Sequence, residues 1–371
     1  MNNFTKVKHL GRTWLHDGIL WLPLSASGIA FSFTGKKLSV TIAGDDSTKL
    51  PFYKQKEPAR VAIYIDGQRK KDRLIKAEET ILPILSSRKA TTHEIMILKL
   101  TEAPMSIVGI KEFTMDDAAE ITPLPAKKRK IEFIGDSITC GYGVDDEVPE
   151  HHYKTSTQDA TKAFAYRCAE ILDADYSLVS FSGHGIISGY VENGVPKLQE
   201  LVPPLYTRLG LSRGLANGRQ IYDEKWDFTK FIPDTIVINL GTNDDSYCQD
   251  HEERQNHFAS EYAQFLRLVR MKNPSAKIVL ILGVMGDRLF PFVQKAMEKF
   301  IEMTGDDNIE AHRIEPIKRY EGYVADYHPT SMTHERVAKQ VAAILKGEKP
   351  METPAEDPAK EVKKELESSE K

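Results

Sequence analysis

Four short segments carry the residue types needed to transfer an acyl group. Ser137 ends the string Ile-Gly-Asp-Ser, and its hydroxyl becomes a nucleophile when a base removes its proton. His328 lies in Asp-Tyr-His-Pro, and its imidazole titrates near neutral pH, so it can be that base. The main-chain N–H of Gly183 and the side-chain amide of Asn243 suit a developing oxyanion. The set therefore predicts nucleophilic acyl chemistry.

The positions of the four segments along the chain support this prediction more strongly than any single motif does. Ser137 alone is weak evidence, because Asp136 and Ser137 could simply cap a helix and the G-x-S-x-G motif of α/β hydrolases is absent. However, each segment lies just beyond a predicted strand, and open α/β sheets bind ligands at the carboxyl ends of their strands. We therefore expect Ser137, Gly183, Asn243 and His328 to converge.

The strands that would position these residues belong to a predicted α/β domain over residues 130–347. Short apolar runs alternate there with amphipathic stretches, which is typical of a parallel sheet covered by helices on both faces. We expect a three-layer α/β/α arrangement. Strands are expected at 131–134, 177–181, 235–240, 278–282 and about 309–314, and helices at 161–172, 252–271, 290–303 and 332–345.

Residues 1–118 have a different pattern, in which short runs alternate apolar and polar side chains between turn signals. In the clearest run, 29–42, the dipeptide Gly35-Lys36 predicts a hairpin turn, and Asp66-Gly67 predicts a second tight reversal. Several strands without intervening helices favour an all-β sandwich domain of jelly-roll type.

Two further stretches are expected to lie outside both domains. Residues 119–129 lose the alternation and contain two prolines, so they are expected to form a linker. Residues 348–371 are dominated by Glu and Lys and have almost no large apolar side chains, so they are expected to form a disordered tail.

With these motifs, the chain resembles the GDSL/SGNH hydrolase superfamily, and most closely the family 2 carbohydrate esterases, which place a jelly-roll domain ahead of the hydrolase domain. The resemblance is carried by FIGDSITCGYG at 133–143, SFSGHGI at 180–186, WDFTKFIPDTIVINLGTND at 226–244 and DYHPTSMTHERVA at 326–338, together with GRTWLHDGILWLPLSASGIAFSFTG near the start. It implies that Ser137 is the nucleophile and first oxyanion donor, Gly183 and Asn243 are the other donors, and His328 is the base. It also implies a carboxylic ester hydrolase, an acetyl xylan esterase that removes acetyl groups from xylan or related plant polysaccharides.

One position departs from the superfamily pattern, which has an aspartate three residues before the histidine. Here residue 325 is Ala and the acid is Asp326, two residues before His328. We expect Asp326 to orient His328 as the third catalytic residue. The alternative is that a backbone carbonyl holds the imidazole and leaves a Ser-His dyad.

Two aromatic residues, Trp226 and Tyr247, could stack on a sugar ring, although packing is at least as good an interpretation for Trp226. Neither a metal nor another cofactor is expected, since the oxyanion hole does the polarising that a Lewis acid would otherwise do. His151-His152 has no third ligand at a regular spacing, and Cys140 is expected to be an apolar filler.

The composition limits which binding partners and which cellular location we expect for the protein. The chain of 371 residues has 50 Lys and Arg against 54 Asp and Glu, so no nucleic-acid partner is expected. No segment has the roughly 20 apolar residues of a membrane span, and charges break up the N-terminal stretch, so we expect a cytoplasmic protein acting on acetylated oligosaccharides. A lipase or thioesterase acting on another small acyl group and a non-catalytic carbohydrate-binding protein are the alternatives. The regioselectivity, the natural sugar and homo-oligomer formation are left open.

Overall fold

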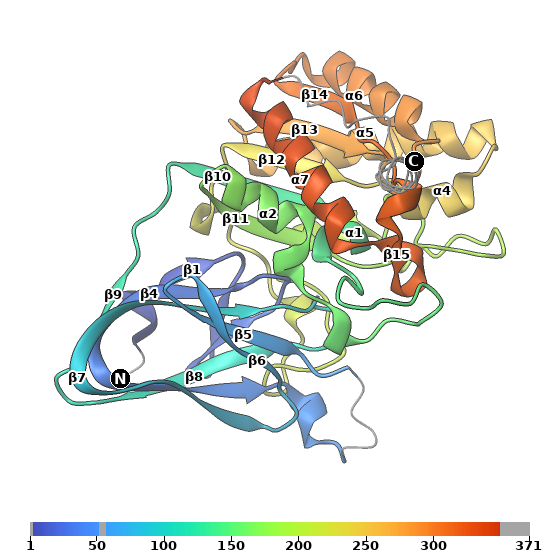
Figure 1. Cartoon of the computed structure of the whole chain (residues 1–371). Coiled ribbons are helices and arrows are strands. Elements are labelled where there is room, and N and C mark those ends of the chain that lie inside the picture. Colours follow the sequence, from blue (N-terminus) through green and yellow to red (C-terminus); the bar gives the residue numbers. More distant parts are fainter. Residues whose placement is uncertain (1–2, 52–56, 349–371) are drawn as a thin grey trace, which may run out of the picture.

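A computed structural model describes residues 3–51 and 57–348 and contains an antiparallel β-rich domain followed by an α/β domain (Figure 1). The predicted tail at 348–371 lies outside the described residues, apart from residue 348. Within the described ranges, no helix combines the length and apolar character needed to cross a bilayer.

The α/β domain is built on a five-stranded parallel sheet with the order β11-β10-β12-β13-β14. Each strand coincides with a predicted one to within three residues at either end, which confirms the parallel α/β fold. The strands are β10 (Arg129–Gly135), β11 (Ala174–Ser180), β12 (Thr235–Asn239), β13 (Lys277–Leu282) and β14 (Ile309–Arg313).

Helices cover both faces of this sheet because its strands are apolar on both faces. Phe133 and Val237 lie in a core that includes α2 and α7, while Ile134 and Ile238 lie in the core of the opposite face with α5 and α6 (Figure 1). The three layers are therefore present as expected. The helices are α1 (Ser137–Cys140), α2 (Phe164–Ile171), α3 (Val202–Tyr206), α4 (Thr242–Cys248), α5 (Glu252–Lys272), α6 (Phe290–Thr304) and α7 (Ser331–Lys346).

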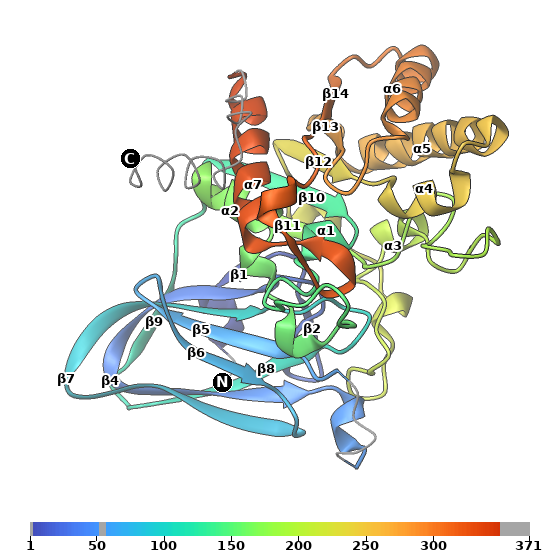
Figure 2. The ribbon, with the colours of Figure 1, turned by 45° about the vertical axis from the view of Figure 1, so that its right-hand side comes forward.

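The β-rich domain is one continuously hydrogen-bonded sheet of nine antiparallel strands that curls around its own core (Figure 2). Its main path runs β2-β3-β8-β4-β7-β5-β6, and β1 and β9 also pair with β4. The strands are β1 (Lys8–Leu10), β2 (Trp14–His16), β3 (Ile19–Leu22), β4 (Gly28–Gly44), β5 (Arg60–Ile65), β6 (Gln68–Leu74), β7 (Glu79–Lys99), β8 (Val108–Met115) and β9 (Glu120–Pro123).

The hairpin predicted at Gly35-Lys36 is wrong. β4 continues through these residues and pairs with β7 from Gly28 to Ala43, with one register shift between Gly35 and Lys37 and another between Leu38 and Ser39. A turn signal became an irregularity within a long strand, because hydrogen bonds to β7 are available on both sides of it. The reversal at Asp66-Gly67 is confirmed, since both residues have positive φ and join β5 to β6.

The predicted linker at 119–129 is also corrected. β9 begins at Glu120 and pairs with β4, so this part of the stretch belongs to the sheet of the β-rich domain. The loss of apolar alternation reflects an edge strand of four residues with only Ile121 buried.

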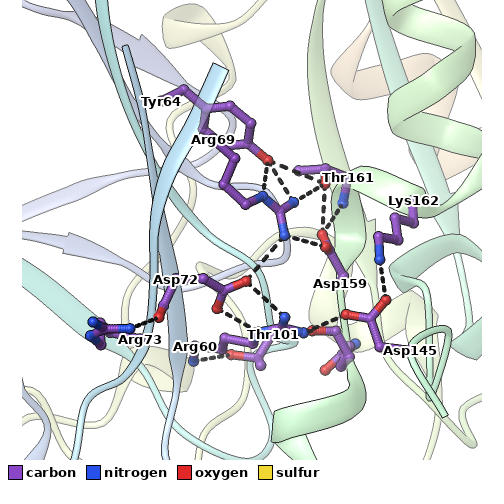
Figure 3. Close-up of polar contacts among 11 residues, drawn as sticks. Arg60, Tyr64, Arg69, Asp72, Arg73, Thr101, Asp145, Asp159, Thr161 and Lys162 are labelled. Carbon is purple, nitrogen blue, oxygen red and sulfur yellow. Dashed lines mark hydrogen bonds and ion pairs between the residues drawn. The ribbon is translucent and has the colours of Figure 1, made fainter. Parts of the chain in front are cut away.

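Charged side chains join the two domains around Asp72 of β6 (Figure 3). Arg60 reaches across to Asp145 with an N–O distance of 2.7 Å, and Arg69 reaches Asp159 at 2.6 Å. Burial by itself would raise the pKa of Asp159, but the hydrogen bond and charge of Arg69 hold that pKa below its ordinary value. The loop after α1 is therefore held from the β-rich domain.

Arg12 is a second anchor between the domains and is 1% exposed. Its Nη1 donates to the carbonyl oxygens of Tyr206 at 2.7 Å and Arg208 at 2.6 Å. Its Nη2 lies 3.6 Å from Oε2 of Glu132, which is also buried. The guanidinium centre lies 5.4 Å from the ring centroid of Tyr206, so charge, hydrogen bonds and aromatic contact act together.

We predict that Arg12→Ala lowers the free energy of unfolding by about 3–5 kcal/mol, because it leaves the Glu132 carboxylate buried without its cation. Denaturant titration followed by fluorescence measures this change. The control is Lys339→Ala, which removes an exposed i,i+4 pair with Glu335 and should leave unfolding unchanged within error. A loss below about 1 kcal/mol for Arg12→Ala would show that Arg12 is not an anchor.

Candidate active site

Ser137 is the first residue of α1 and follows the end of β10, which is flanked by a parallel strand on each side. The turn between them is tight, since a Cβ on Gly135 would lie 2.0 Å from Oγ1 of Thr139. Asp136 caps the helix by accepting the N–H of Ile138 at 3.0 Å. Ser137 is 6% exposed, and its own N–H has no partner among the described residues. That N–H is therefore free for a ligand.

Two further candidate segments meet Ser137 at the same edge of the sheet. In the pairing register, Gly135 at the end of β10 lies beside Ser180 of β11 and Asn239 of β12. Because the three strands end together, the loops that follow them emerge side by side. The structure thus brings the serine, glycine and asparagine segments together at one sheet edge.

The loop after β11 presents the Gly183 N–H. Gly183 has φ +77°, and a Cβ placed on it would meet nothing within 4 Å, so the space in front of this residue is open. The Nδ1–H of His184 donates to the Ser182 carbonyl at 2.9 Å, and the Tyr190 N–H donates to the Gly183 carbonyl at 2.9 Å. Burial lowers the pKa of His184, which keeps its ring neutral. No described residue accepts the Gly183 N–H.

Asn243 is the second residue of α4, which follows β12, and is 7% exposed. Its Nδ2 donates to the His184 carbonyl at 2.9 Å and has a longer contact, 3.4 Å, with Oδ2 of Asp136. The short bond fixes the plane of the amide, and the long one leaves the second N–H weakly bonded. Burial raises the pKa of Asp136 to about 7.

The next residue, Asp244, was missed by the sequence analysis. Its buried carboxylate accepts the main-chain N–H groups of Ile186, Ile187 and Ser188 at 2.7–3.1 Å. Burial raises the pKa of Asp244 to about 6, although these N–H groups act in the opposite direction. Asp244 thereby holds the glycine loop, residues 181–189 after β11, against α4. The available signal was the acidic residue directly after Asn243 in the Gly-Thr-Asn-Asp string of residues 241–244.

His328 lies in a small hairpin formed by β15 (Tyr323–Val324) and β16 (His328–Pro329), directly before α7. Its Nδ1–H donates to main-chain carbonyls, at 3.0 Å to Asp326 and 3.2 Å to Ala325. Because Nδ1 carries the proton, Nε2 is the nitrogen able to accept one. Burial lowers the pKa of His328 to about 4, so the ring is neutral at physiological pH.

The prediction that the Asp326 carboxylate orients His328 is corrected. That carboxylate accepts hydrogen bonds from Tyr142 Oη at 2.7 Å, His152 Nδ1 at 3.0 Å and the Tyr153 N–H at 3.1 Å. Asp326 has φ +51° at the tip of the hairpin, and this conformation turns its carbonyl, rather than its carboxylate, towards the imidazole. The alternative of a backbone carbonyl is the one observed, and Asp326 instead holds the loop after α1.

Tyr142 links the serine and histidine segments and was not singled out from the sequence. Its ring stacks on His328 with centroids 4.1 Å apart, and its N–H donates to the Ser137 carbonyl at 3.2 Å. Within the described part of the chain, no hydrogen bond joins the Ser137 hydroxyl directly to His328. Such bonds often tighten only when substrate binds.

The two predicted sugar-binding residues have different outcomes. Trp226 is 7% exposed and packs against the guanidinium of Arg12 at 5.2 Å, so it is a core residue and its prediction as a sugar platform is wrong. A tryptophan before a strand was buried by an arginine from the other domain. Tyr247 lies one turn after Asn243 on α4, with Arg254 over its ring at 4.4 Å, and its role in binding stays a prediction.

We predict that the His328 imidazole titrates with a pKa of about 4, because desolvation disfavours its protonated form. A two-dimensional NMR titration of ring resonances measures this value, with His328→Gln identifying the signals. A midpoint near the ordinary value of about 6.5 would contradict the buried, neutral ring.

Comparison with known proteins identifies both domains. Residues 9–125 match the family described as carbohydrate esterase 2 N-terminal, and residues 133–336 match the GDSL-like lipase/acylhydrolase family. The chain is 25% identical over 328 residues to the cellulase/esterase CelE of Acetivibrio thermocellus, covering 87% of this chain and 37% of CelE. It is 33% identical over 201 residues to an acetylxylan esterase / glucomannan deacetylase of Cellvibrio japonicus, covering 51% of this chain and 52% of that protein. The alignments thus span only about a third to a half of these two relatives.

Solved structures have the same two-domain fold. An acetyl xylan esterase, Est2A, from the rumen bacterium Butyrivibrio proteoclasticus matches with a TM-score of 0.82 and 26% identity, over 92% of this chain and 95% of that one. A family two carbohydrate esterase from Clostridium thermocellum, in complex with cellohexaose, matches with a TM-score of 0.77 and 24% identity, over 92% and 98% of the two chains. Since the matched hydrolase segment is more than half of the sequence, the chain belongs to the GDSL-like lipase/acylhydrolase family and carries the N-terminal domain of the family 2 carbohydrate esterases.

Proposed function

We propose that this protein is a serine esterase that removes acetyl groups from xylan-derived or related plant oligosaccharides. The observation that carries the proposal is the convergence of two free main-chain N–H groups and an asparagine amide on one sheet edge, beside a neutral histidine whose Nε2 can accept a proton. The names of the relatives, an acetylxylan esterase / glucomannan deacetylase and an acetyl xylan esterase, support the substrate class.

The reaction would proceed through an acetyl-enzyme. His328 Nε2 takes the proton of the Ser137 hydroxyl as its oxygen bonds to the acetyl carbon, and the carbonyl electrons move onto oxygen. The N–H groups of Ser137 and Gly183 and the amide of Asn243 stabilise that oxyanion. The bond between the acetyl carbon and the sugar oxygen then breaks, and the sugar oxygen takes the proton from His328. A water molecule, with its proton taken by His328, then attacks the acetyl-enzyme in the same way, and acetate is released.

The histidine works here as half of a dyad. The carbonyls of Ala325 and Asp326 hold the Nδ1–H and present negative dipole ends to the ring when it becomes protonated. The Tyr142 face, stacked 4.1 Å from His328, adds a favourable cation–π contact to the imidazolium. Two carbonyls and one aromatic face replace the carboxylate of a full triad.

Exposed aromatic rings beside the site support a carbohydrate substrate. Tyr327 precedes His328 and is 55% exposed, and Tyr190, whose N–H donates to Gly183, is 49% exposed. Exposed tyrosine rings have an apolar face that can cover the C–H face of a pyranose. We assign both rings to binding the sugar that carries the acetyl group.

The proposal predicts that the protein releases acetate from acetylated xylo-oligosaccharides and that Ser137→Ala lowers kcat by roughly 1,000-fold or more. Mass spectrometry of the products follows the loss of acetyl groups. Activity of Ser137→Ala within tenfold of the parent would remove Ser137 as the nucleophile. Faster cleavage of butyryl and longer esters than of acetyl esters would move the substrate to another acyl class.

A second prediction concerns Asp326→Asn, which should retain kcat within about tenfold. Asparagine tolerates the left-handed backbone at this position, so the carbonyl that orients His328 stays in place. Loss of an essential triad aspartate would instead cost on the order of 10,000-fold. Steady-state hydrolysis of 4-nitrophenyl acetate separates the two outcomes, and a loss of the larger size would restore Asp326 as a catalytic acid.

Some expectations from the sequence stay predictions. They are the jelly-roll topology of the β-rich domain, the cytoplasmic location, and the presence or absence of homo-oligomers. A location inside the cell would suit short acetylated oligosaccharides that have been imported.

A further inference from the structure

A carboxylate from the β-rich domain reaches the main chain beside the proposed oxyanion hole. Glu102 lies between β7 and β8 and is 0% exposed. Its Oε2 accepts the N–H of Ser182 at 2.8 Å. Ser182 belongs to the α/β domain and directly precedes Gly183, whose N–H is the second proposed oxyanion donor. The other domain thus contacts the residue next to that donor.

Glu102 is itself held in place from both domains. Its N–H donates to Oε1 of Gln158 at 3.0 Å, and its carbonyl accepts a bond from Nζ of Lys99 at 2.9 Å. Gln158 also donates to the carbonyl of Cys140, the last residue of α1, at 3.1 Å. The Cys140 thiol in turn contacts the Ser182 hydroxyl at 3.3 Å. Glu102 therefore lies between the two segments that present the main-chain oxyanion donors.

The contact between Glu102 and the Ser182 N–H controls the direction of the Gly183 N–H. A peptide unit is planar, so the bond from His184 to the Ser182 carbonyl sets the direction of the Gly183 N–H at the other end of that unit. Glu102 holds the preceding peptide unit through the Ser182 N–H. With both units held, rotation about the Ser182 backbone is restricted. Without Glu102, a part-buried N–H would lose its acceptor and the restriction.

The surroundings of the carboxylate suit a fixed acceptor. Burial raises the pKa of Glu102, while the bonds from Ser182 and the charge of Lys99 oppose this shift. Lys99 is also fully buried, and burial lowers its pKa to about 7. Oε1 of Glu102 has no partner among the described residues. The Ser182 N–H needs a hydrogen-bond acceptor here, and that acceptor does not have to be charged.

We propose that Glu102 is a positioning residue for the oxyanion hole, supplied to the α/β domain by the β-rich domain. The proposal rests on the proposed function, in which Gly183 is an oxyanion donor. It makes the β-rich domain part of the catalytic apparatus, acting through Ser182 on the Gly183 N–H.

The test compares variants of Glu102 in the full chain. Glu102→Ala should lower kcat for 4-nitrophenyl acetate by about 10- to 100-fold, less than or equal to the loss of one oxyanion donor, with KM changed less than about threefold. Glu102→Gln keeps a side-chain carbonyl for Ser182 and should stay within about threefold of the parent. An unchanged kcat in Glu102→Ala, or an equal loss in Glu102→Gln, would overturn the proposal.

The matched control is Asp46→Ala. Asp46 is another carboxylate of the β-rich domain that accepts a main-chain N–H of the α/β domain, from Gly218 at 2.7 Å, but it contacts none of the proposed site residues. Its loss should leave kcat unchanged. An equal fall in kcat for Asp46→Ala would attribute the effect to domain contact in general and overturn the proposal.

A readout independent of the sugar is the rate at which an alkyl fluorophosphonate labels Ser137. The Ser137 oxygen bonds to phosphorus, fluoride leaves, the proton passes to His328, and the phosphoryl oxygen occupies the oxyanion position. Labelling should slow at least tenfold in Glu102→Ala and remain fast in Glu102→Gln. Fast labelling without release of sugar acetate would overturn the substrate proposal alone, whereas equal rates in all variants would overturn the role of Glu102. No labelling of the parent chain would overturn both.

Should Glu102→Ala not fold, Glu102→Asp provides the test. It keeps the charge beside Lys99 and withdraws the carboxylate from the Ser182 N–H by one methylene. Thermal unfolding checks that it is folded. A folded Asp variant should label at least threefold more slowly than the parent chain, and labelling at the parent rate would overturn the proposal.

Discussion

The site depends on two main-chain N–H groups that stay free, that of the buried Ser137 and that of the part-buried Gly183. A buried N–H without a partner costs about 1–3 kcal/mol, so the chain would gain stability by turning it towards another acceptor. Ser137 is 6% exposed and Asn243 is 7% exposed, and the N–H of Ser137 is unpaired among the described residues. The structure around them must therefore prevent small rotations that would satisfy these donors internally.

Buried carboxylates supply much of that restraint. Asp136 accepts the N–H that follows Ser137, Asp244 accepts three N–H groups of the glycine loop, and Glu102 accepts the N–H that precedes Gly183. Burial raises the pKa of each of these groups, which shows that the surroundings disfavour their charge. Each carboxylate fixes the direction of a neighbouring peptide unit, so that the oxyanion donor itself stays free.

His328 is also held by hydrogen bonds, but here the side chain donates and the main chain accepts. Main-chain carbonyls accept the Nδ1–H of His328, and the residue that supplies the shorter bond, Asp326, uses its carboxylate to hold the loop of Tyr142 and Tyr153. Burial outweighs the hydrogen bonds to the Asp326 and Ala325 carbonyls and the charge of the Asp326 carboxylate, and it lowers the pKa of His328 to about 4. The base is weaker than in a full triad but is neutral over a wide range of pH.

The sequence by itself determined the five strands of the α/β domain and its longer helices, α2, α5, α6 and α7, but not the short α1, α3 and α4, because apolar periodicity over a long run records which faces are buried. It therefore placed the serine, glycine and asparagine at one sheet edge. Only the tertiary structure decided which groups surround them. β4 runs through Gly35 because β7 pairs with it, and Trp226 is buried because Arg12 packs on it. Similarly, Asp326 turns its carbonyl to the histidine, and Glu102 reaches the site from another domain. These outcomes depend on contacts between residues far apart in the chain, which local propensity does not encode.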